Sequence, residues 1–181
     1  WDFSISDEAA AELFRSVEGV TELRALTIVN TYLTPAAVRS LAATGWRLEE
    51  LRLYCLRSLG AAGIATLLAA TTFALRRLVL SQCGLDATAV FTLANAPWPL
   101  EDLDLSSNDF SAGATGPALA ALSRHAGLRR LDVSNCHLSA AGFKALVEAV
   151  WPSLTFFGVC GAAVAFDGPH ALGAAAFAGF P

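Results

Sequence analysis

The sequence has no methionine, and only 15% of its 181 residues are charged. Twelve basic and sixteen acidic residues give a net charge of −4, which argues against nucleic-acid binding because such proteins carry a basic face. Apolar residues make up 55%, a content that excludes intrinsic disorder. We therefore predict a folded domain without a nucleic-acid partner. Because the chain opens on Trp1 without any methionine, we expect a fragment of a longer protein.

Residues that carry site chemistry are also scarce. The four cysteines form no CxxC motif, and no two of the three histidines have metal-ligand spacing. The sequence contains no phosphate-binding glycine loop and no serine elbow. We therefore predict a non-enzymatic protein without a metal, a cofactor or a small-molecule substrate. The alternative is that His137 and Asp109 flank a metal or act as acid and base, but a surface-loop histidine is the simpler interpretation.

The longest segment without charge runs from Ser58 to Leu75 and approaches the length that crosses a bilayer. Its glycines, serines and threonines, and its many alanines, make membrane insertion weak. The repeat described next explains the same residues without lipid. We therefore predict no membrane association.

One apolar pattern recurs along the chain at intervals of 25 to 28 residues. Three copies fit the form LxxLxLxx(N/C)xL at every apolar position: LRRLVLSQCGL (75–85), LEDLDLSSNDF (100–110) and LRRLDVSNCHL (128–138). Looser copies begin at Leu23, Leu48 and Leu154. The alternation within each copy predicts a strand with every second side chain facing inward.

A helical pattern follows the strand segments. The spacing of one buried helix face recurs in Ile64, Leu67 and Leu68, in Val90, Leu93 and Ala94, and in Phe143, Leu146 and Val147. Residues typical of helix N-caps stand at equivalent places: Thr34 before Pro35, Asp86 and Ser139. A strand-and-helix unit buries its apolar face only by stacking on the next unit, so we expect a continuous stack.

These copies resemble the leucine-rich repeat family, in its ribonuclease-inhibitor-like class, over essentially the whole chain. The resemblance implies an α/β solenoid with a parallel sheet on the concave side and helices on the convex side. It also implies a single domain, 1–181, of about six repeats, which binds another protein.

In this family, an asparagine at the ninth position of each copy bonds the backbone of the turn. Here that position holds Thr31, Leu56, Cys83, Asn108, Cys136 and Ala162. A cysteine is a weak donor that can substitute. Leu56 and Ala162 offer no such bonds, so we expect irregular second and sixth turns.

The two ends extend the pattern beyond the complete copies. Ile5 fits the last position of an earlier copy, with a helix expected over 6–17, and a helix over 167–177 is expected to close the sixth copy. We expect a middle section of a longer solenoid. The alternative is that the apolar tail folds over and caps the last repeat.

The second and third positions carry charges whose sign changes from copy to copy. They read Arg24-Ala25, Glu49-Glu50, Arg76-Arg77, Glu101-Asp102 and Arg129-Arg130. Neighbouring strands lie about 5 Å apart, so each basic pair is expected to face acidic pairs. Opposite charges across strands favour this register and like charges oppose it. We interpret the charges first as a device that sets register, and the alternative is a binding feature.

The fifth, seventh and eighth positions are expected to face outward on the concave sheet, where this family usually binds partners. They form a polar surface with an acidic region, and a tyrosine beside an arginine is a typical binding anchor. We predict that a protein partner contacts Arg52, Tyr54, Arg77, Asp102, Asp104, Asp132 and Asn135. The alternative is a solvated sheet face that binds no partner in this segment.

Two further residue classes recur at repeat positions. Aromatics stand just before the strands at Trp46, Phe73, Trp98 and Trp151, and we expect them to fill turns rather than form a surface row.

Cys83 and Cys136 occupy one column two copies apart, roughly 10 Å by strand spacing, which is too far for a disulfide. We therefore predict a reducing, cytoplasmic location.

The predicted function is a rigid scaffold that presents one preformed surface to a partner protein, because little ordering entropy is then lost on binding. An alternative is the substrate-recognition arm of a larger assembly, such as an F-box ubiquitin ligase, an immune receptor or a bacterial effector, where similar repeats occur. A less favoured alternative is a GTPase-activating regulator, which would need a positioned arginine or asparagine at a repeat loop.

Overall fold

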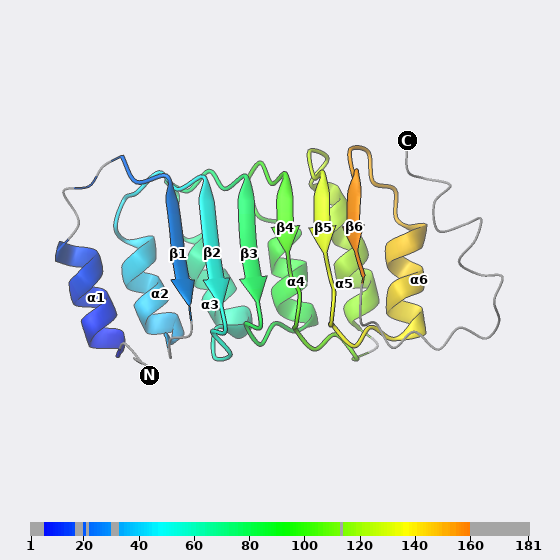
Figure 1. Ribbon diagram of the computed structural model, residues 1–181, viewed down its shortest axis with the longest axis horizontal. Helices are drawn as coiled ribbons and strands as arrows, with labels where there is room; N and C mark the ends of the chain where they lie inside the picture. The colour runs from blue at the N-terminus through cyan, green and yellow to red at the C-terminus, as the bar shows by residue number, and fades with distance from the viewer. Residues whose placement is uncertain (1–5, 17–19, 21, 30–32, 113, 160–181) are drawn as a thin grey trace.

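The computed structural model describes residues 6–16, 20, 22–29, 33–112 and 114–159. Strands and helices alternate along this part of the chain (Figure 1). The elements are α1 (Asp7–Ser16), β1 (Ala25–Val29), α2 (Pro35–Ala42), β2 (Glu50–Tyr54), α3 (Gly60–Leu68), β3 (Arg77–Ser81), α4 (Ala87–Leu93), β4 (Asp102–Asp104), α5 (Thr115–Ala121), the 3-10 turn η1 (Leu122–Arg124), β5 (Arg130–Asp132), α6 (Ala140–Glu148) and β6 (Phe156–Gly158). The expectations for Ile5, Thr31, Ala162 and the helix over 167–177 lie outside the described residues.

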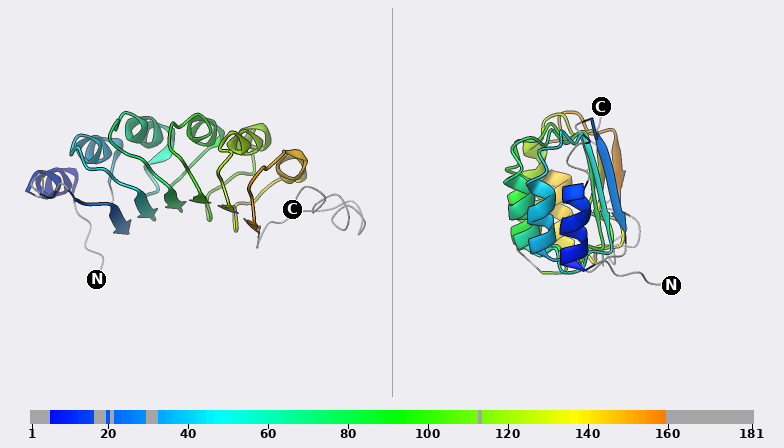
Figure 2. Two further views of the ribbon diagram at one scale, coloured as in Figure 1. Left: turned by 90° about the horizontal axis from the view of Figure 1, so that it is seen from above. Right: turned by 90° about the vertical axis from the view of Figure 1, so that its left-hand side faces the viewer.

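The six strands form one sheet in chain order, and every neighbouring pair is parallel. The third residues of the six copies lie side by side across it: Ala25, Glu50, Arg77, Asp102, Arg130 and Phe156. Figure 2 shows the helices along the outer, convex side of a curved stack and the strands along its inner side. The fold is therefore the predicted α/β arrangement, consistent with a leucine-rich repeat solenoid.

The core lies between the sheet and the helices. Leu78, Leu103 and Leu131 are neighbours in the strand register and are all fully buried. The four aromatics that precede strands are also buried: Trp46, Phe73, Trp98 and Trp151. This confirms that they belong to the core, as aromatics at fixed repeat positions were expected to do. Each repeat therefore completes the apolar core of its neighbours.

Helix starts follow the predicted caps. The side chains of Thr34, Asp86 and Ser139 accept hydrogen bonds from backbone N–H groups in the first turns of α2, α4 and α6. Each side chain satisfies a donor that has no partner within its helix. Pro35 opens α2, where its missing N–H costs nothing.

The ninth-position asparagine is a buried hydrogen-bond centre. Its Nδ2 donates to the carbonyls of Leu80 and Leu105, both at 2.8 Å. Its Oδ1 accepts from the backbone N–H groups of Cys83 at 3.0 Å and Leu85 at 3.1 Å. Asn108 therefore ties the β4 repeat to the turn of the preceding β3 repeat, as the resemblance implies.

Cysteine replaces this asparagine in two repeats. The thiol of Cys83 donates to the carbonyl of Leu53 at 3.4 Å, and that of Cys136 donates to the carbonyl of Leu105 at 3.1 Å. The backbone N–H of Leu56 in turn bonds the Cys83 sulfur. A thiol thus links each turn to the repeat before it, with weaker bonds than the amide makes.

The second turn is more regular than predicted. The eighth residues of four copies share left-handed backbone, with φ of 60° at Cys55, 56° at Gln82, 59° at Ser107 and 56° at Asn135. Leu56 does not disturb this conformation, because its side chain is fully buried and its N–H has a partner in Cys83. The predicted irregularity is confined to the start of α3, where the N-cap residue Leu59 has helical backbone and makes no side-chain cap hydrogen bond.

The helix within the long uncharged segment is too short to cross a bilayer. The apolar segment 58–75 contains α3, which has nine residues, and a turn follows it before β3. Among the described residues, no helix is long and apolar enough to cross a membrane.

The two buried thiols have raised pKa values. Burial raises the pKa of Cys83 and of Cys136 from the ordinary 9.0 to about 12, so both stay neutral at physiological pH. The pKa of each thiol is higher in the folded chain than in the unfolded chain. The contribution of the neutral thiols to folding stability is therefore fully present below about pH 9. It is lost as the pH rises from about 9 towards 12.

We expect these thiols to resist alkylation in the folded protein. At about pH 8, iodoacetamide should label the half-buried Cys55 directly, but Cys83 and Cys136 only as fast as the chain unfolds. Peptide mass mapping over time measures each rate. If Cys83 reacted as fast as Cys55 without denaturant, the conclusion that Cys83 is a buried, neutral thiol would be wrong.

Candidate partner-binding surface

The third, fifth and seventh positions of each copy share the concave face. In β2, Glu50, Arg52 and Tyr54 are partly exposed, whereas the alternating Leu51 and Leu53 are buried. The same alternation places the predicted residues Arg77, Asp102, Asp104 and Asp132 on this face of β3, β4 and β5. The third position therefore belongs to the concave surface together with the fifth and seventh.

A row of charges crosses the sheet along the third position. Arg77 lies 2.9 Å from Glu50 on β2 and 3.2 Å from Asp102 on β4. Asp102 also lies 3.6 Å from Arg130 on β5, and that guanidinium stacks 3.6 Å from the ring centroid of Phe156 on β6. We call Glu50, Arg77, Asp102, Arg130 and Phe156 the charge ladder.

The charge ladder confirms that alternating signs accompany the predicted register. The negative charge of Glu50 is the main cause that raises the pKa of Arg77 above its ordinary value. A parallel contact at the second position joins Arg76 to Glu101, and a looser one joins Arg24 to Glu49 at 3.8 Å. These pairs are partly exposed, so each contributes little alone, but together they favour the observed register.

We expect R77E to destabilise the sheet modestly. The substitution removes two ion pairs and places a third carboxylate between Glu50 and Asp102, which should lower the free energy of unfolding by about 1 kcal/mol. The loss should shrink in high salt, because salt screens exposed charges. Urea unfolding with R39E, which alters an exposed arginine on α2, gives the matched comparison. Equal losses of unfolding free energy in R77E and R39E would contradict a stabilising role of these ion pairs.

The fifth position carries the acidic residues of the predicted site. The Asp104 carboxylate accepts from the N–H of Ser106 at 2.8 Å, and that of Asp132 accepts from the N–H of Ser134 at 3.0 Å. Arg130 also contacts Asp132 at 3.0 Å. Among the described residues, Asp104 forms no ion pair, so it is the concave carboxylate that retains an uncompensated charge.

Arg52 and its neighbour Val79 complete the fifth position. The Arg52 guanidinium lies 2.6 Å from Glu50. Val79, which pairs with Arg52 and Asp104 across the sheet, is only 6% exposed despite its outward position. The centre of the concave face is therefore an apolar residue surrounded by charged neighbours.

The seventh and eighth positions are mostly small and polar. Ser106 donates to the hydroxyl of Ser81 at 3.1 Å, and the Cys55 thiol donates to the side-chain oxygen of Gln82 at 3.1 Å. Tyr54 ends β2 half-buried, and Asn135 is exposed in the turn after β5. The structure thus brings six predicted residues together on neighbouring strands and places Asn135 at the edge of the same surface.

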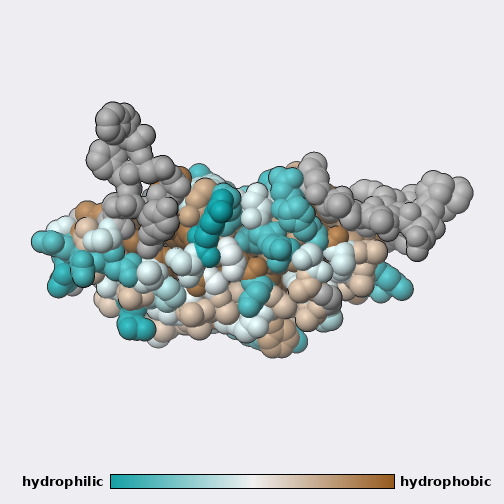
Figure 3. Space-filling model, turned by 90° about the horizontal axis from the view of Figure 1, so that it is seen from below, coloured by the Kyte–Doolittle hydropathy of each residue, from teal (hydrophilic) through white to brown (hydrophobic). Residues whose placement is uncertain are grey.

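Three contributors to this surface were missing from the predicted site. Glu50 and Arg130 carry third-position charges that were interpreted first as a device for register and second as a binding feature, and Phe156 was not considered; all three take part in the charge ladder. The strand alternation itself would have placed them on the concave face. Figure 3 shows that hydrophilic side chains gather towards the sheet side, while the helix side is paler and more apolar.

The alternative chemistry at Asp109 and His137 gains no support from the geometry. Both residues are exposed in turns. Hydrogen bonds from Ser111 lower the pKa of Asp109, and the nearby His137 lowers it slightly further. Among the described residues, no group of three or more His, Cys, Asp or Glu side chains is arranged to hold a metal ion.

Comparison with known proteins adds one family match. The family model described as Leucine Rich repeat matches residues 128–147, which run from just before β5 into α6. No curated protein matches the chain. Leucine-rich repeat proteins commonly act as protein-interaction scaffolds, and the repeat itself is typically non-catalytic. The chain therefore contains a leucine-rich repeat at residues 128–147, within a parallel α/β stack whose other units follow the same register.

Proposed function

We propose that this chain is a non-enzymatic scaffold that binds a partner protein on the concave face formed by β2, β3, β4 and β5. The observation that carries the proposal is a continuous outward surface whose charged side chains are held by cross-strand contacts. Side chains held in this way lose little rotamer freedom when a partner binds. We also propose that all the repeats belong to the ribonuclease-inhibitor-like class of leucine-rich repeats.

The chemistry of the surface favours a partner with a basic side chain at its centre. Asp104 retains an uncompensated charge beside the apolar Val79, and Tyr54 offers an aromatic ring at the end of β2. An arginine or lysine of the partner would pair with Asp104. The charge ladder runs beside Asp104 and would align the partner along the sheet.

Quantitative partner capture tests the assignment. D104K should reduce capture at least about tenfold, since reversing a charge at the centre of an interface costs more than 1.4 kcal/mol, and Y54A should reduce it similarly. The matched control is E148K, which makes the same change of charge at an exposed site on α6. Unchanged capture in both concave variants, or an equal loss in E148K, would overturn the proposed site.

The rival assignments remain predictions. They are an F-box or immune-receptor recognition arm, a bacterial effector and a GTPase-activating regulator. The cytoplasmic location also stays a prediction, although the described cysteines Cys55, Cys83 and Cys136 are free thiols.

A further inference from the structure

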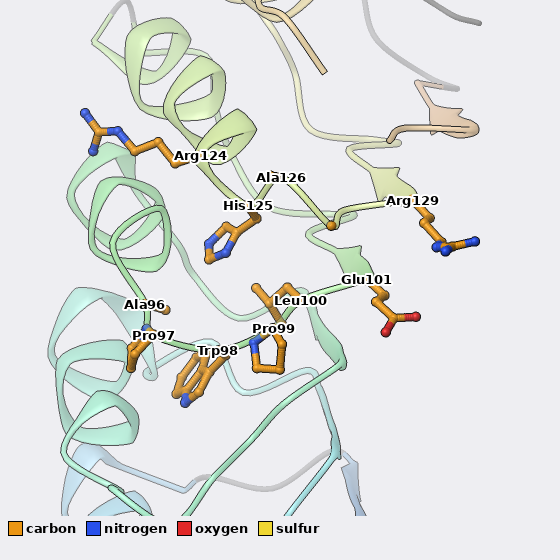
Figure 4. A pocket seen from close by; sticks show the side chains of 11 residues that line it. Ala96, Pro97, Trp98, Pro99, Leu100, Glu101, Arg124, His125, Ala126 and Arg129 are labelled. Carbon is orange, nitrogen blue, oxygen red and sulfur yellow. The ribbon is translucent and has the colours of Figure 1, made fainter. Parts of the chain in front are cut away.

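A pocket lies away from the concave face, at the edge where the strands begin. Its volume is ≈ 430 Å³, and it separates the loop from α4 to β4 from the loop that joins η1 to β5. Figure 4 shows the imidazole of His125 projecting from one loop towards Trp98 and Pro99 on the other. A pocket of this size accommodates a few side chains of a ligand.

The walls of this pocket are held rigidly by contacts between the two repeats. The Nε2 atom of His125 lies 2.9 Å from the carbonyl of Leu93 at the end of α4. Arg124 donates to the side-chain oxygen of Asn95 at 2.8 Å and stacks 5.4 Å from the ring centroid of Phe91. The pocket is therefore a formed feature of the fold.

The charge of the pocket is positive, in a chain whose net charge is −4. Among the described residues, neither Arg124 nor Arg129 forms an ion pair, whereas Arg76, Arg77 and Arg130 each contact a carboxylate. The one carboxylate in the pocket, that of Glu101, is already paired with Arg76. In Figure 4, Arg124 and Arg129 lie at opposite ends of the pocket, and both side chains extend outward from its rim.

We propose that this pocket is a second docking site, which takes an acidic segment of a partner protein. Carboxylates of the segment pair with Arg129 and Arg124, and an apolar side chain between them packs on the Pro97 and Pro99 side of the pocket. Charge complementarity identifies the occupant, because two guanidinium groups without an ion pair lie at the rim of a hollow lined by Pro97, Trp98 and Pro99. The site is independent of the proposed concave surface.

Binding of a defined probe tests this site. The probe is a fluorescein-labelled pentapeptide with one leucine between two pairs of glutamates, and anisotropy measures its affinity for the full chain. R129E should weaken binding at least about tenfold, because a charge-assisted hydrogen bond is lost and repulsion replaces it. R47E is the matched control, since Arg47 is an exposed arginine in the loop before β2, and it should leave the affinity unchanged.

Further measurements distinguish the ligand class and the position. The indole N–H resonance of Trp98 should shift with the glutamate peptide, and not with the equivalent lysine peptide or with inorganic phosphate. E101Q should tighten binding, because it removes a repelling carboxylate. Y54A and D104K should leave the peptide affinity unchanged, so failure of the concave site would not imitate failure here. Equal weakening by R129E and R47E, or an unshifted Trp98 resonance at saturation, would overturn the proposal.

Discussion

Replacing Asn108 with alanine is expected to lower the free energy of unfolding by about 3–5 kcal/mol. The substitution leaves the buried N–H groups of Cys83 and Leu85 without an acceptor, at a cost of about 1–3 kcal/mol each. It also deprives the carbonyls of Leu80 and Leu105 of a donor. Urea denaturation followed by circular dichroism measures the loss.

N108C provides the matched comparison for this prediction. The thiols of Cys83 and Cys136 already bond the preceding repeat from the same position, so a cysteine at 108 should recover part of the lost stability. If N108C were as unstable as N108A, the ninth position would act through shape alone. A loss below about 1 kcal/mol in N108A would contradict the bonding role itself.

The second large effect is expected from L103A. Leu103 is fully buried in β4, with Leu78 and Leu131 as its register neighbours on either side. Removing its side chain leaves a cavity in the shared core, and such substitutions cost about 2–5 kcal/mol. Because each repeat is stabilised by its neighbours, the loss should destabilise the β3 and β5 repeats as well.

Hydrogen exchange shows whether that loss spreads. In L103A, backbone amides of β3 and β5 should lose protection together with those of β4. D104A is the control, since it alters the adjacent residue on the opposite, concave face and should change the unfolding free energy by less than about 1 kcal/mol. Comparable stability loss in both variants would contradict a core on one side of the sheet.

The sequence predicts the stack well because its signal is periodic. Leucines at fixed positions identify each strand, and the register of Leu78, Leu103 and Leu131 follows directly from the aligned copies. The N-cap of α4 at Asp86 was predictable for a different reason, since its side chain bonds a backbone N–H three residues away. Interactions of either kind depend on local residue types.

Features that depend on contacts between repeats were harder to predict. Leu56 suggests an irregular turn when considered alone, but the thiol of Cys83 in the next repeat bonds its N–H. The pocket beside His125 is a further example, because its shape depends on how the loops of two repeats pack. Sequence patterns give the position of each loop and leave open which atoms meet across the gap.

Photo-crosslinking from two positions shows whether the partner lies on the concave face. A benzophenone-bearing phenylalanine analogue would replace either Tyr54 at the end of β2 or the exposed Ala65 on α3. We expect the analogue at position 54 to crosslink the partner, and we expect no crosslink from the analogue at position 65. Crosslinking from position 65 alone would place the partner on the helices and contradict binding on the concave face.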